Sequence, residues 1–206
     1  MILETVNAVS GLGTMCAAIV GVVVAGRGVH AWRHELAGRH GYELARRLAL
    51  GIYGCRNKIK AIRHSIIWSD EMESALQSSG IKMDTVPKEK RSSIEQSAVY
   101  GARWNRLVEI RHGLDADILE AEVMWGSDWA SALEPVDALH LKLYVALQDH
   151  VRTYDTEQFK QMPTERVVEV GRLIHEVSAG DEFTAEYNAA VESVVKRLRP
   201  HLDAKK

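Results

Sequence analysis

Cysteine and proline are both scarce in this chain of 206 residues, and each scarcity excludes something. The two cysteines, Cys16 and Cys55, lie in apolar stretches without a CxxC spacing or a nearby group of histidines. This excludes a disulfide framework and a zinc-finger motif, so we expect both thiols to be small packing residues. The four prolines stand where apolar helical patterns stop or restart, and are expected to mark helix boundaries.

Common signatures of enzymes are missing as well. The sequence contains no GxSxG elbow for a nucleophilic serine, no GxxxxGK[ST] phosphate loop and no GxGxxG dinucleotide motif. We therefore predict no catalytic residue, no cofactor and no metal site, and an enzyme is the less favoured class.

The near-neutral net charge of −2 hides an uneven distribution. Residues 1–26 carry −1, residues 27–63 carry +7 and residues 64–206 carry −8. An acidic body argues against nucleic acid as a partner, because nucleic-acid-binding domains need a basic surface that displaces counterions.

The first long pattern predicts a membrane span. Residues 5–26 are 22 consecutive uncharged residues, close to the ~20 that a helix needs to cross a bilayer. A soluble helix of this length would show a polar face, and this one shows none. No Lys or Arg precedes it, so we do not expect a cleaved signal peptide. A buried helix or strand is the alternative reading.

The flanking charges predict the orientation of this span. Arginines cluster just after it, whereas residues 1–4 carry only Glu4, so the amino terminus is expected outside and residues 27–206 in the cytoplasm. This predicts a single-pass membrane protein with its large domain on the cytoplasmic face. The predicted anchors at the lipid interface are Arg27, Trp32 and Arg33.

Small residues recur at every fourth position within the span. They form one ridge that lets a second helix approach closely, so self-association into a homo-oligomer is one expected partnership. The ridge consists of Gly13, Ala17, Gly21 and Ala25.

The remaining strong patterns have helical period, which predicts an all-α fold. We expect an N-terminal transmembrane helix followed by a cytosolic helical bundle, with two long antiparallel helices and about three shorter ones. The predicted segments are a long basic amphipathic helix over 27–77, a second long helix over 88–126 and C-terminal helices over 135–199. The first has a coiled-coil-like apolar seam of Ala45, Leu48, Ile52, Cys55, Ile59, Ile62 and Ile66.

A motif after the span, Trp32-x-x-Glu35-Leu36-x-Gly38-x-x-x-Tyr42-Glu43-Leu44-Ala45-Arg46, is similar to one in a group of bacterial single-pass membrane helical proteins. Lys58-x-x-x-Ile62-Arg63 and Glu120-Ala121-x-x-x-Trp125-Gly126 also resemble that group. The resemblance covers about the first 65 residues well and the rest loosely. It implies the architecture and, with the predicted orientation, a location in a bacterial inner membrane, but no activity.

These observations favour a membrane-anchored scaffold or interaction protein, with the lipid bilayer and an unidentified protein as partners. The candidate partner corner is Trp125, Gly126 and Trp129, at the junction of two helices. One alternative is a helical metal-binding protein or enzyme. It requires several of five inward-facing residues to converge: Glu109, Glu120, Asp137, His140 and His150. Another alternative is a mobile-element or host-defence component that acts on the envelope.

Overall fold

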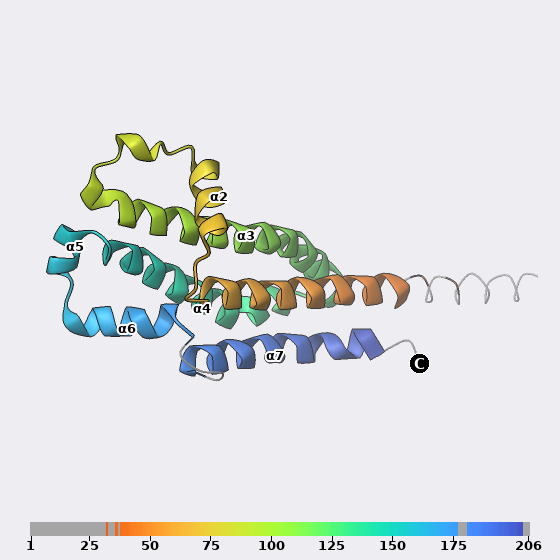
Figure 1. Ribbon diagram of the computed structural model, residues 1–206. Coiled ribbons are helices and arrows are strands. Elements are labelled where there is room, and N and C mark those ends of the chain that lie inside the picture. Colours follow the sequence, from red (N-terminus) through yellow and green to blue (C-terminus); the bar gives the residue numbers. More distant parts are fainter. Residues whose placement is uncertain (1–31, 33–35, 37, 177–180, 204–206) are drawn as a thin grey trace, which may run out of the picture.

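The computed structural model describes residues 32, 36, 38–176 and 181–203, and every regular element in these ranges is helical (Figure 1). The predicted all-α class is confirmed for this part of the chain. The predicted span over 5–26, its small-residue ridge and the anchors Arg27 and Arg33 lie outside the described residues. Within those ranges, no helix is long and apolar enough to cross a bilayer.

The first helix covers residues 38–62, in the orange part of Figure 1. The later elements are α2 (Ser69–Ser79), the short 3-10 helix η1 (Met83–Thr85), α3 (Lys88–Trp125), α4 (Asp128–Arg152), α5 (Thr156–Gln161), α6 (Thr164–Ile174) and α7 (Glu182–Asp203). The long first helix, α3, α4 and α7 form the bundle, and α2 lies across it (Figure 1).

The first helix and α3 run antiparallel, as predicted for the two long helices. His40 contacts Glu120 near one end of the pair, and Arg103 reaches the carbonyl of Ile62 at the other. Between these points the Leu114 side chain packs closely against Gly51, where a Cβ atom would stand only 2.7 Å from a methyl carbon of Leu114. Glycine is therefore needed here for packing.

The other long helices close the core from the opposite side. α4 returns antiparallel to α3, and Arg111 of α3 binds Asp137 of α4 through Nε and Nη2 at 3.1 and 2.9 Å. α7 runs antiparallel to α4, as the hydrogen bond between His140 and Tyr187 and the ion pair between Lys142 and Glu186 show. α6 packs on the C-terminal part of α4.

The predicted apolar seam of the first helix is buried along its length. Six of its members are at most 4% exposed: Ala45, Leu48, Ile52, Cys55, Ile59 and Ile62. Burying a Leu or Ile side chain contributes roughly 1.5–3 kcal/mol, so this seam accounts for much of the favourable free energy of packing. The predicted packing role of Cys55 is confirmed, and burial raises the pKa of its thiol to about 11.

The first helix is shorter than predicted, because the pattern that suggested a helix through residue 77 is interrupted. The helix ends at residue 62, residues 64–68 have no regular structure, and α2 starts at Ser69. Ile66, the seventh member of the predicted seam, is consequently 52% exposed. Buried Arg103 binds carbonyl groups in this break, so a contact distant in sequence overrides the local helical pattern.

Proline marks a boundary less often than predicted. Pro135 lies inside α4, which begins seven residues earlier at Asp128, and Pro200 lies inside α7. The extra turns of α4 bury Trp129, Ala132 and Leu133 in the bundle. This burial offsets the backbone hydrogen bond that a proline removes.

Candidate functional site

The predicted partner corner is a cluster of aromatic rings at one end of the bundle. The rings of Trp125 and Trp129 lie 5.1 Å apart, and His201 from α7 stacks on Trp125 at 3.9 Å. Gly126 joins α3 to α4 with φ +107°, a conformation that glycine adopts without strain. Gly41 of the first helix lies against the same cluster, since a Cβ there would be 3.9 Å from Trp125 Nε1.

Much of this corner is occupied by the chain's own side chains. Trp129 is 8% exposed, and Trp125 is half-buried beneath His201. The exposed apolar groups nearby are on α3, where Val123 is 87% exposed and Leu119 is 64% exposed. The corner therefore packs four helices together, and the apolar surface near it that a partner could reach consists of exposed side chains of α3 such as Val123.

Near this corner, exposed charged side chains of the first helix form ion pairs with side chains of α3. Arg47 binds Asp117 at 2.9 Å and Glu120 at 2.5 Å, and His40 Nε2 lies 2.8 Å from a second oxygen of Glu120. Hydrogen bonding to Asp117 raises the pKa of Arg47, although burial opposes it. Trp32, the predicted interface anchor inside the described ranges, is helical and 64% exposed.

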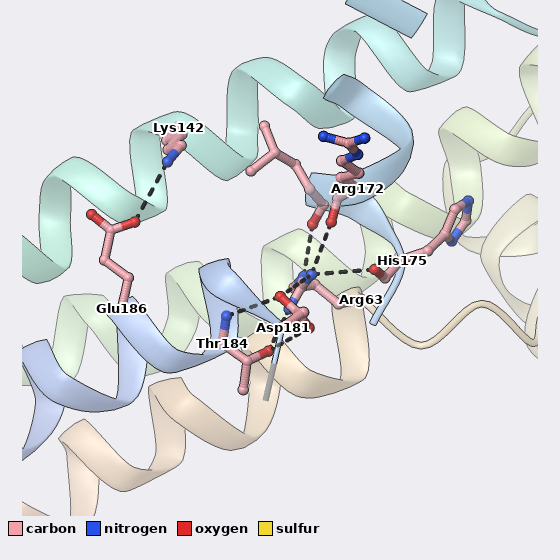
Figure 2. Close-up of polar contacts among 8 residues, drawn as sticks. Arg63, Lys142, Arg172, His175, Asp181, Thr184 and Glu186 are labelled. Atoms are coloured by element: carbon pink, nitrogen blue, oxygen red, sulfur yellow. Dashed lines mark hydrogen bonds and ion pairs between the residues drawn. The ribbon is translucent and has the colours of Figure 1, made fainter. Parts of the chain in front are cut away.

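The opposite end of the bundle contains a buried arginine that the sequence analysis named only as part of a resemblance motif, without a structural role. Arg63, at the end of the first helix, is 2% exposed and points between α6 and α7 (Figure 2). It donates to the carbonyl oxygens of Arg172, Leu173 and His175, the carboxylate of Asp181 and the hydroxyl of Thr184. Its guanidinium carbon also lies 4.7 Å from the centre of the Phe183 ring.

Arg63 therefore joins three helix ends. The last carbonyl groups of a helix have no partners within the helix and carry partial negative charge, and Arg63 satisfies those of α6. Burial alone would raise the pKa of Asp181, but hydrogen bonds from Arg63 and Thr184 outweigh it and hold that pKa below its usual value. The charge on Arg63 is thus compensated inside the protein.

Arg103 of α3 performs a similar role on the other side of the first helix. It is 5% exposed and donates to the carbonyl oxygens of Ile62, His64 and Ile66. Both carboxylate oxygens of Glu71 in α2 also accept from it, at 2.8 and 2.7 Å. These hydrogen bonds lower the pKa of Glu71, although burial opposes them. Arg103 therefore fixes the break between the first helix and α2.

The metal or enzyme hypothesis requires several of five residues to converge. Asp137 Oδ1 lies 3.9 Å from His140 Nδ1, but the five do not come together as a group. Glu109 is exposed, Glu120 pairs with the first helix and Asp137 binds Arg111, while His140 and His150 lie in separate clusters. Across the described ranges, no group of three or more His, Cys, Asp or Glu side chains is placed to hold a metal ion.

The two buried histidines of α4 have different surroundings. His140 Nε2 lies 2.9 Å from the hydroxyl of Tyr187, and burial lowers its pKa to about 4. His150 packs edge-on against the rings of Tyr100, Tyr154 and His175, and its Nε2 has no hydrogen-bond partner. Burial and the neighbouring His175 lower the pKa of His150 to about 4 as well. Both imidazoles are therefore neutral at pH 7.

A cavity of about 750 Å³ lies between α4, α6 and α7, close to the Arg63 cluster. Its walls combine apolar groups such as Val168 and Phe183 with charges of both signs. Lys142 on one wall is paired with Glu186 (Figure 2). The cavity has the size of a small-molecule site.

Comparison with known protein families, with curated proteins and with solved structures finds no match. The class that the fold defines is an all-α helical bundle. The similarity of the Trp32–Arg46 motif to bacterial single-pass membrane proteins stays a prediction from the sequence.

Proposed function

We propose that this protein is a membrane-anchored helical scaffold that holds an interaction domain at the inner face of a bacterial inner membrane. The observation that carries the proposal is the run of 22 uncharged residues over 5–26, followed by a basic flank. The described bundle has paired surface charges and no group of three or more His, Cys, Asp or Glu side chains placed to hold a metal ion, which is compatible with a binding role.

The length of the connection determines how the anchor acts. Eleven residues, 27–37, separate the predicted span from the described first helix, and a fully extended chain of this length reaches about 40 Å. The bundle would thus stay within about 40 Å of the lipid. Confinement of this kind raises the effective concentration toward another membrane-bound protein to the order of mM, without any new contact.

Flotation of the full-length chain with membranes tests the anchor. An Arg at the centre of a transmembrane helix costs about 2.5–3.5 kcal/mol for insertion, and this span is only moderately apolar. We therefore expect Met15→Arg to shift most of the chain out of the floating fraction in alkaline buffer. Met15→Leu, the matched control, should float like the wild type. If the wild-type chain stays at the bottom of the gradient, the proposal is wrong.

Self-association through the Gly13, Ala17, Gly21 and Ala25 ridge is a second part of the proposal. Cysteine crosslinking in membranes tests it, because Gly21→Leu would prevent close helix contact whereas Val22→Leu, beside the ridge, would not. Equal dimer yields from the two variants would remove the ridge as the contact face.

A further inference from the structure

The break between the first helix and α2 exposes two large apolar side chains. Ile66 is 52% exposed and Trp68 is 66% exposed, and only one residue separates them in the chain. Exposed Trp is uncommon on surfaces that serve only for solubility and is enriched among the residues that dominate binding free energies. This segment, residues 64–68, is therefore the first element of a candidate binding surface.

The segment is held in place before any partner arrives. Buried Arg103 binds the carbonyl oxygens of His64 at 2.7 Å and Ile66 at 2.9 Å, and the same guanidinium is fixed by Glu71. A surface that is already ordered loses less conformational entropy on binding than a flexible loop. The contacts of Arg103 thus position Ile66 and Trp68 as well as supporting the fold.

A groove with a basic rim adjoins these two side chains. It has a volume of about 380 Å³, and Ile66 and Trp68 belong to its lining. Lys58, Lys60 and Arg106 also line it, and none of the three forms an ion pair with another described residue. The carboxylate in the lining, Glu71, is already bound by Arg103, so the groove presents uncompensated positive charge.

The groove lies far along the first helix from the end that follows the predicted span. It lies at residues 57–68, whereas the chain enters the bundle at residue 38, and 24 helical steps of 1.5 Å correspond to about 36 Å. A ligand there is therefore expected to come from the aqueous side. This position disfavours the bilayer that holds the span as the occupant.

We propose that this groove binds an acidic peptide segment that carries an apolar side chain. The apolar side chain packs against Trp68 and Ile66, while flanking carboxylates of the peptide bind Lys58, Lys60 and Arg106. The proposal rests on the function proposed above, because it names the kind of partner that the scaffold recruits. Charge complementarity accounts for selectivity, since the rest of the domain is acidic and repels such a peptide.

Fluorescence anisotropy with four labelled probes tests this proposal on the full-length chain in lipid nanodiscs. The probes are the acidic dodecapeptide DEDEFLEDEDED, its variant with Ser-Ser in place of Phe-Leu, the basic peptide KRKRFLKRKRKR and a twelve-nucleotide oligothymidine. We expect the first peptide to bind at least tenfold more tightly than the others, with an affinity that falls as salt rises.

Matched variants locate the site. Trp68→Ala should weaken binding of the acidic Phe-Leu peptide about tenfold or more, whereas Leu141→Ala, at an equally exposed apolar side chain of α4, should leave it unchanged. The double change Lys58→Glu with Lys60→Glu should abolish that binding and create affinity for the basic peptide. The control Lys196→Glu, on α7, should do neither.

The proposal is overturned if no probe binds, if oligothymidine binds best, or if the Trp68 and lysine variants bind like the wild type. Flotation of the same variants distinguishes a failure of the groove to bind the peptide from a failure of residues 5–26 to anchor the chain. A chain that floats but does not bind the peptide contradicts the groove alone, and a chain that does not float contradicts the anchor.

Discussion

The two ends of the first helix are held in different ways. Near residue 40, exposed ion pairs join it to α3 through His40 and Arg47, and Trp125 of α3, beside this end, stacks on a ring of α7. Near residue 62, two arginines at most 5% exposed bind the carbonyl groups of helix ends. Exposed ion pairs contribute about 0–1 kcal/mol, whereas loss of one partner from a buried pair costs about 3–5 kcal/mol. Stability at the second end therefore depends far more on single side chains.

Arg63→Met gives the largest expected effect and tests this contrast directly. It leaves Asp181 without its cationic partner, with Thr184 as the remaining donor, and removes the donor to the α6 carbonyl groups in a nearly buried position. We therefore expect a loss of about 3–5 kcal/mol in the free energy of unfolding. Arg47→Met, on the exposed end of the same helix, should cost about 1 kcal/mol or less. Thermal unfolding followed by circular dichroism measures both, and equal losses would refute the contrast.

A decrease in pH should have the next largest effect on folding stability, because it protonates the buried imidazoles when the protein unfolds. A histidine whose pKa is about 4 in the folded protein and ~6.5 when unfolded binds more protons after unfolding. Stability is then fully present above pH ~6.5 and falls as pH decreases toward 4, by up to about 3 kcal/mol for His150.

His150→Phe isolates this contribution. The substitution keeps the ring contacts with Tyr100, Tyr154 and His175 and removes a nitrogen without a hydrogen-bond partner. We expect stability at pH 7 to be unchanged or higher, and the loss between pH 7 and 4 to be smaller than in the wild type. Urea unfolding at several pH values checks this, and identical pH profiles for the two proteins would contradict it.

Gly51→Ala probes the middle of the first helix, between the two ends. Its new Cβ would stand 2.7 and 2.8 Å from two carbon atoms of Leu114, so we expect a net loss of about 1–2 kcal/mol despite the higher helix propensity of Ala. Gly101→Ala in α3 has no atom within 4 Å of its new Cβ and should gain about 0.5–1 kcal/mol. A higher free energy of unfolding for both variants would contradict this, because it would mean that the first helix and α3 accommodate the extra methyl group without loss of packing.

His201→Ala at the aromatic corner should have a smaller effect than Gly51→Ala. It removes a stacking contact of 3.9 Å with Trp125 at a partly exposed site, which is worth about 0.5–1.5 kcal/mol. A loss as large as that from Arg63→Met would mean that the corner, and not the buried arginines, dominates stability. Thermal unfolding under the same conditions gives this comparison.

Periodicity predicted the core well because burial of a helix face depends on residue spacing. The apolar seam from Ala45 to Ile62 and the all-α class follow from it. Periodicity did not reveal that Arg63 and Arg103 are buried, since their partners lie 32 to 121 residues away and an arginine at such a position looks like part of a solvated face. A turn signal was also missing at residues 63–68, because no Gly or Pro occurs there.

Candidate sites were less predictable than the core. Trp125 and Trp129 do lie together, as their spacing at a helix junction suggested, but His201 comes from a distant helix and fills the space beside them. The basic groove could not be read from the sequence, because Trp68 and Arg106 meet only after the chain reverses at the break and in η1.

Two-sided labelling of an introduced cysteine tests the central claim, that residues 5–26 anchor the bundle on the inner face of a membrane. Ser92→Cys introduces an exposed thiol in α3, whereas native Cys55 is buried. The wild-type chain serves as the control for labelling of Cys55 and of Cys16, which belongs to the predicted span. A membrane-impermeant maleimide should label Cys at position 92 in membrane-associated protein only after the cells are permeabilised. Labelling in intact cells, or recovery of the labelled chain in the soluble fraction, would contradict the account.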